Sequence, residues 1–300
     1  MNFHYIVIIP DLISLFRVSL SKLTLILSII FLFQSCSPAL MLEISPGTAE
    51  HLFEHKLQKQ SKKVRLNPHN PQILEAASMD LVKYGYGFLL ESADQVIFQD
   101  YEKSNDLYEQ ALENFAKAIE YGESALSIKY SNYQKWNRLG KFETPPFSAE
   151  DVSLIFWTAG AYAGAITASK ADPDWLIHFP RIGRLFDQAL ILDPGWNKGA
   201  LYSAMISYTM LEPNPAENRE EISRDYFQKA VFASNGKDCG PYLALAEKVS
   251  KTNQDKSEFI SLLNQALDID NKVDRDLKLS NAISKKRARW LLDNVDEFFY

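Results

Sequence analysis

Apolar side chains recur every three or four residues along most of the chain, which is the spacing of one face of an α-helix. The clearest set follows Pro71, a residue suited to a first helical turn. It comprises Ile73, Leu74, Ala77, Leu81, Tyr84 and Phe88. A second set follows Ser104 or Asn105, one of which we expect to cap its helix. It comprises Leu107, Tyr108, Ala111, Leu112, Phe115, Ala118 and Ile119. No segment alternates apolar and polar residues between hairpin turns, so the pattern predicts an all-α fold.

The middle of the chain predicts a helix that is buried on several sides. Ser148 is a plausible helix cap, and with Asp151 three residues later it comes close to a capping box. The run 152–169 after them has no charged side chain. Its 18 residues reach the length of a membrane helix. However, Gly160 and Gly164, with the alanines and hydroxyl groups around them, make poor contacts with lipid. The run therefore favours a helix packed closely inside the protein, with the two glycines at helix contacts.

A short motif recurs along the chain: an aromatic residue or leucine with alanine three positions later. The four pairs are Phe115 and Ala118, Phe186 and Ala189, Phe227 and Ala230, and Leu263 and Ala266. The alanines are 71, 41 and 36 residues apart, close to two, one and one tetratricopeptide units of about 34 residues. The motif predicts tetratricopeptide-like helical-hairpin repeats in a superhelical or compact array. A non-repetitive helical bundle is the alternative.

The first residues of the chain have the features of a secretion signal. Residues 23–33 form an uncharged apolar run of 11 residues, with Arg17 and Lys22 before it. This length suits a signal peptide and is too short to span a bilayer as a helix. The Phe-Gln-Ser-Cys sequence at 33–36 resembles the lipobox of bacterial lipoproteins. In such a signal Cys36 becomes the lipidated first residue of the mature protein.

These features predict three parts of the chain. Residues 1–35 form a lipoprotein signal peptide, residues 36–47 a lipidated tether, and residues 48–300 an α-helical domain with tetratricopeptide-like repeats. A plain membrane anchor and an apolar start without function are the alternatives. We expect the protein on the periplasmic side of a bacterial membrane, anchored by lipid to the outer membrane.

Composition narrows the function classes. The chain has 32 basic and 38 acidic side chains, a net charge of −6, whereas nucleic-acid binders usually cluster an excess of Lys and Arg. Two cysteines exclude a disulfide framework. With Cys36 acylated, Cys239 is the remaining thiol, and we expect it to be buried rather than reactive.

Candidate catalytic motifs are weak. His51, Glu54 and His55 match the H-x-x-E-H zinc motif. Such peptidases also need a distant carboxylate ligand and a fold with a sheet, so a solvated helix face is the favoured interpretation. No nucleophile elbow or complete phosphate loop occurs. We therefore predict a protein that is not an enzyme and holds no metal or cofactor.

Aromatic side chains gather in the middle of the sequence and are candidates for binding a partner or an apolar ligand. They are Trp157, Tyr162, Trp175, Phe179, Trp196 and Tyr202. Core packing is the default interpretation. Trp175 and Trp196 follow turns, so we expect these two to be the most exposed. On the last helix Lys285, Lys286 and Arg289 form a basic stripe, which we interpret as a solvated face.

Five further motifs follow one another between residue 67 and residue 300. They are Asn67-Pro68-His69-Asn70, Phe156-Trp157-x2-Gly160-Ala161, Leu192-Asp193-Pro194-Gly195-Trp196, Tyr226-Phe227-x2-Ala230-Val231 and Arg287-Ala288-x2-Leu291-Leu292. In this order they resemble the T-component of tripartite ATP-independent periplasmic (TRAP) transporters, a family of lipoproteins with tetratricopeptide-like repeats. It implies a component of a solute uptake system whose partner is the extracytoplasmic solute-binding subunit. It also suggests self-association. A lipoprotein scaffold for envelope assembly and a zinc-dependent hydrolase are the alternatives.

Overall fold

The computed structural model describes residues 46–140, 142–213, 216–270 and 274–300. Over these residues the chain folds into helices and turns without a strand, as the apolar spacing predicts. The N-terminal helices are α3 (Pro46–Leu66), α4 (Pro71–Tyr84), the π-helical turn η1 (Gly85–Leu90), α5 (Glu91–Val96), α6 (Tyr101–Lys129) and α7 (Tyr133–Leu139). The central ones are η2 (Ala149–Asp151), α8 (Val152–Ala168), α9 (Pro173–Leu176), α10 (Phe179–Leu192) and α11 (Trp196–Leu211). The C-terminal ones are α12 (Arg219–Ala233), α13 (Gly240–Leu245), the π-helical turn η3 (Ala246–Ser250), α14 (Lys256–Asp268), α15 (Lys278–Asp293) and η4 (Val295–Glu297).

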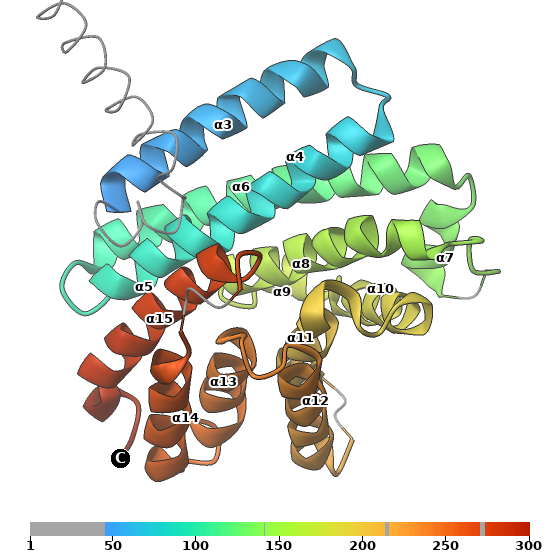
Figure 1. Cartoon of the computed structure of the whole chain (residues 1–300). Helices are drawn as coiled ribbons and strands as arrows, with labels where there is room; N and C mark the ends of the chain where they lie inside the picture. Colours follow the sequence, from blue (N-terminus) through green and yellow to red (C-terminus); the bar gives the residue numbers. More distant parts are fainter. Residues whose placement is uncertain (1–45, 141, 214–215, 271–273) are drawn as a thin grey trace, which may run out of the picture.

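The helices form two groups that cross each other (Figure 1). Helices α3, α4, α6 and α8 lie side by side, whereas α11 to α14 run across the lower part of the same view. Helix α15 returns to the N-terminal group and lies beside α5. The first and last parts of the described chain are therefore neighbours in space.

The described residues form three hydrophobic clusters that connect these groups. The first joins α3, α4, α6, α7, α8, α10 and α11, and the second joins α3, α4, η1, α6 and α8. The third lies between α11, α13, η3, α14 and α15. The four motif alanines, Ala118, Ala189, Ala230 and Ala266, are each at most 1% exposed. Their burial supports close helix contacts at these positions, while the repeat arrangement itself stays a prediction.

Helix α8 confirms the prediction of a closely packed central helix. Ser148 and Asp151 form a capping box, and α8 follows after one 3-10 turn. It contacts α4, α6 and α10. Among the described residues no helix is both long and apolar enough to cross a membrane.

The start of α6 differs from the prediction. The helix begins at Tyr101, and its cap is Asp100, whose carboxylate accepts a hydrogen bond from the Lys103 amide at 3.0 Å. Ser104 is fully buried inside the helix and is not a cap. The first turn of α6 precedes its apolar face, so the apolar spacing placed the start about one turn too late.

Candidate functional site

The predicted lipidation residue, Cys36, lies outside the described residues. The signal peptide and the tether therefore remain predictions.

The six aromatic candidates do not gather around one cavity. Tyr162 and Phe179 are buried in the first hydrophobic cluster, and the Phe179 ring stacks on Tyr208 with 4.9 Å between centroids. The Tyr162 hydroxyl accepts a hydrogen bond of 3.0 Å from Arg181. These two side chains serve core packing in this structure.

The other four aromatic candidates are half-buried. The centroid of the Trp157 ring lies 5.0 Å from the Lys83 ammonium. Tyr202 of α11 lies beside Tyr226 of α12. Trp175 packs against the second hydrophobic cluster and Trp196 against the first. The last two are therefore less exposed than their positions after turns predicted, because each ring covers the edge of a core.

The residues of the zinc motif, His51, Glu54 and His55, lie on α3. His51 and Glu54 lie on exposed turns of α3 and contact each other at 3.1 Å between Nδ1 and Oε2. Glu54 also accepts a hydrogen bond of 3.2 Å from the Tyr84 hydroxyl. No group of three His, Cys, Asp or Glu side chains within the described ranges is placed to hold a metal ion.

The basic stripe of the last helix is not a uniform solvated face, and here the interpretation was wrong. Lys285 is 8% exposed, and its ammonium donates to the carbonyls of Leu267 (2.8 Å) and Ile269. It therefore satisfies free carbonyls at the end of α14. Arg289 is exposed.

A buried ion cluster that the sequence analysis missed joins α15 to α5 and η3. Arg287 on α15 donates to Glu91 (3.1 Å) and Asp94 (2.7 Å) of α5 and twice to Glu247 of η3 (2.6 Å each). Burial raises the pKa of Glu91 to about 7, while the attraction of Arg287 opposes this rise and the repulsion of Glu247 and Asp94 adds to it. Arg287 holds the pKa of Glu247 below its ordinary value despite burial. Removal of the carboxyl group from water is therefore the main reason that Glu91 resists ionisation.

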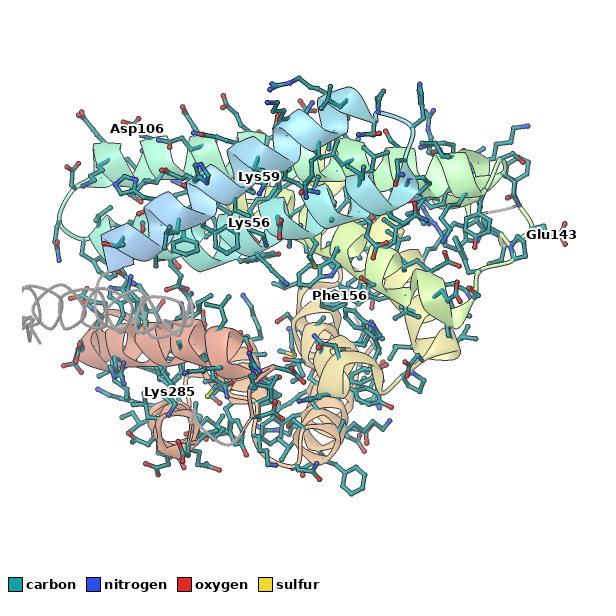
Figure 2. The ribbon with its side chains drawn as sticks, turned by 45° about the horizontal axis from the view of Figure 1, so that its top comes forward. Lys56, Lys59, Asp106, Glu143, Phe156 and Lys285 are labelled. Carbon is teal, nitrogen blue, oxygen red and sulfur yellow. The ribbon has the colours of Figure 1, made fainter. Side chains whose placement is uncertain are left out.

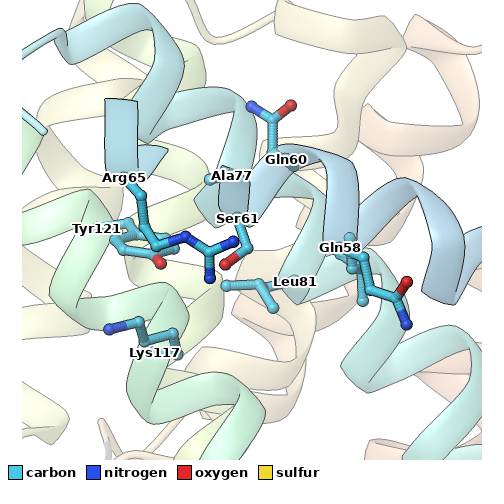
Figure 3. A pocket seen from close by; sticks show the side chains of 9 residues that line it. Gln58, Gln60, Ser61, Arg65, Ala77, Leu81, Lys117 and Tyr121 are labelled. Atoms are coloured by element: carbon cyan, nitrogen blue, oxygen red, sulfur yellow. The ribbon is translucent and has the colours of Figure 1, made fainter. Parts of the chain in front are cut away.

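A pocket that the sequence analysis did not predict lies between α3, α4 and α6 (Figure 3) and has a volume of about 370 Å³. Its lining combines apolar, polar and cationic side chains. These are Leu57, Gln58, Gln60, Ser61, Arg65, Ala77, Leu81, Lys117 and Tyr121. None of the six aromatic candidates is among them.

The side chains of this pocket are held by local contacts. The Gln60 amide donates to the Ile73 carbonyl at 3.2 Å, which fixes α3 on the start of α4. The Lys117 ammonium lies 4.9 Å from the Tyr121 ring centroid and 2.7 Å from Glu120, and this carboxylate raises the pKa of Lys117. Tyr121 is buried and forms part of the pocket lining.

Helix α3 gives this side of the molecule a basic character (Figure 2). Residues 55–74 contain Lys56, Lys59, Lys62, Lys63 and Arg65 but no Asp or Glu, in a chain with a net charge of −6. Lys56 pairs with Asp80 at 2.6 Å, and all five cations lie in exposed residues of α3. This charge run is the sequence signal that could have pointed to the region, and the sequence analysis did not use it.

Comparison with known proteins now identifies the family. The model of the TRAP transporter T-component family matches residues 62–299. The chain belongs to this family. It is also 22% identical over 242 residues to an uncharacterized protein of Treponema pallidum (strain Nichols), with 78% of this chain and 74% of that protein covered. The resemblance predicted from the motifs is confirmed, and the T-component has a role in TRAP transport.

Proposed function

We propose that this T-component is a lipid-anchored protein on the periplasmic side of the membrane that binds the solute-binding subunit of its TRAP transporter and has no catalytic activity of its own. The family match carries the transport role. The helical scaffold supports a binding role, since packed helices offer large rigid surfaces to another protein. The anchor at Cys36 would keep the captured subunit near the membrane.

The aromatic candidates stay a prediction for the binding of a partner or an apolar ligand. Of the six, Trp157, Trp175, Trp196 and Tyr202 retain some exposed surface and can contact a partner without unfolding of the core. An apolar ligand among the buried pair would have to displace packed side chains. Partner binding is therefore the better supported role for this region.

The proposal is tested by co-purification. The tagged full chain, expressed in its own cell and solubilised from membranes, should retain a TRAP solute-binding subunit identified by mass spectrometry. Trp175→Ala should reduce this recovery. Lys59→Ala on α3, far in sequence from the aromatic candidates, is the control and should leave the recovery unchanged. Recovery of envelope-assembly proteins without the subunit would support the scaffold alternative and refute the proposal.

The anchor has a separate readout. Growth with radioactive palmitate should label the original chain but not Cys36→Ser if Cys36 is lipidated. Absence of label from the original chain, with the protein still in the membrane fraction, would instead indicate a plain membrane anchor.

A further inference from the structure

The pocket between α3, α4 and α6 has no part in the proposed docking of the solute-binding subunit, yet it has the size of a ligand site. A volume of about 370 Å³ lies within the range of pockets that bind small molecules. Ala77 and Leu81 of α4 and the ring of Tyr121 provide apolar surface. Ser61 and Gln58 of α3 add a hydroxyl and an amide at the rim.

The charged side chains that line the pocket are all positive. Arg65 and Lys117 are cations, and no carboxylate lines the pocket, although acidic residues outnumber basic ones in the chain. Among the ion pairs between described residues none includes Arg65, whereas Lys117 pairs with Glu120. Figure 3 shows the Arg65 guanidinium between Ser61 and Tyr121, over Leu81. A negative group in this place would therefore find an available cation.

The two cations have different parts. A guanidinium presents paired N–H donors that match the oxygens of a carboxylate or a phosphate, so Arg65 is suited to hold an anion in a fixed orientation. The Lys117 ammonium can turn from Glu120 toward the same anion because its side chain is exposed and flexible. The apolar surface below suits a short alkyl chain or ring rather than a second charge.

We infer that this pocket binds a small acidic amphiphile. Arg65, assisted by Lys117, holds its carboxylate or phosphate group, and its apolar stem lies on Ala77, Leu81 and Tyr121. The same chemistry occurs in a free organic acid and in the headgroup region of an anionic lipid.

Calorimetric titration tests this inference with the full chain in phosphatidylcholine nanodiscs, after subtraction of empty discs. Hexyl phosphate is the probe, hexanol lacks its charge, and inorganic phosphate lacks its stem. Hexyl phosphate should bind with saturation. Hexanol and phosphate should each bind at least about tenfold more weakly, since each loses one half of the recognition.

Variants locate the site. Arg65→Gln should weaken hexyl phosphate binding about 10- to 100-fold, as expected for loss of hydrogen bonds to a charged group. Lys59→Gln is the matched control, because it removes the same charge from the same helix but does not line the pocket. Its effect should stay below about threefold. Ser61→Trp should fill the cavity and abolish binding while circular dichroism shows unchanged helix content.

Three results would overturn the inference. These are saturable binding of hexanol as tight as that of hexyl phosphate, an equal loss for Lys59→Gln and Arg65→Gln, and no saturable binding of hexyl phosphate. Discs containing phosphatidylglycerol separate the two sources. Competition with hexyl phosphate indicates a lipid headgroup, and unchanged affinity indicates a free acid.

Discussion

At the scale of single residues, Cys239 shows how burial decides the chemistry of a side chain. Cys239 is fully buried, and its thiol donates a hydrogen bond of 3.2 Å to the Ala266 carbonyl. The Cys239 amide donates to Asn281 at 2.9 Å, which links the start of α13 to α15. Burial raises the pKa of the thiol to about 12. Because the thiolate is the reactive form, this cysteine is inert in the folded protein.

We therefore predict that Cys239 resists alkylation by iodoacetamide near neutral pH. Mass spectrometry of the peptide that contains Cys239 measures the modified fraction. The same reaction in denaturant is the control and should label the residue fully. Rapid labelling under native conditions would contradict the burial of this thiol.

The raised pKa of Glu91 predicts that the stability of the protein depends on pH. Its folded pKa of about 7 lies above the ordinary value of 4.5, so the folded state binds the proton more tightly than the unfolded state. Its stabilising contribution is present below about pH 4.5 and is lost as the pH rises toward 7, by up to about 3 kcal/mol. Glu247, with its lowered pKa, acts oppositely and loses its contribution as the pH falls below 4.5.

Replacement of Glu91 by Gln should flatten this dependence. Urea unfolding at about pH 5 and about pH 8 should show a smaller loss of unfolding free energy in Glu91→Gln than in the original chain. Glu102→Gln, at an exposed residue of α6, is the control. Equal losses in the original chain and in Glu91→Gln would show that this carboxyl does not titrate in that range.

At the scale of one element, α8 depends on glycine where another helix approaches. A Cβ at Gly164 would lie 2.3 Å from the Phe115 ring, so α6 packs directly on this backbone. At Gly160 the nearest atom, a methyl of Val82, is 3.6 Å away, an ordinary contact. The two glycines therefore have different roles although the sequence presents them as a pair.

Alanine at these two positions should have opposite effects. Gly164→Ala should destabilise the protein by about 1–3 kcal/mol, because α8 and α6 must separate. Gly160→Ala should be neutral or stabilising by up to about 1 kcal/mol, since alanine favours the helix. Thermal or urea unfolding of both variants measures the difference. Similar unfolding free energies for the two variants would contradict the packing of α6 on α8.

At the scale of the whole molecule, α15 packs against α5, which lies about 190 residues earlier in the sequence. Arg287 contacts carboxylates that precede it by 193 and 196 residues. Beside it the rings of Phe98 and Trp290 stack with 6.2 Å between centroids. Ile283 lies against Gly87, where a Cβ would be 2.9 Å from its methyl group. Polar and apolar contacts thus converge on one seam between the two helix groups.

Loss of Arg287 should weaken this seam strongly. Arg287→Ala leaves three carboxylates without their shared cation, so we expect a loss of about 3–5 kcal/mol in unfolding free energy. Arg289→Ala, on the same helix but exposed, should change it by at most about 0.5 kcal/mol. Chemical unfolding followed by circular dichroism measures both. An equally small effect of Arg287→Ala would show that the seam does not depend on this cluster.

The sequence by itself determined the all-helical fold, the capping box before α8 and the family. These depend on local spacing and on motif order, and both are properties of neighbouring residues. The error in the predicted start of α6 also comes from reliance on local spacing. The helix begins before its apolar face, and the apolar spacing does not indicate the cap at Asp100.

Only the tertiary structure decided what depends on distant segments. The charge run on α3 was visible in the sequence, but its pocket forms only where α3 crosses α4 and α6 and brings Arg65 near Lys117 and Tyr121. Likewise Lys285 and Arg289 are one turn apart on α15, and the sequence pattern predicted both to be exposed. Lys285 is instead buried against the end of α14. Burial and the pairing of charges are set by which helices pack together, and a linear pattern contains no record of that packing.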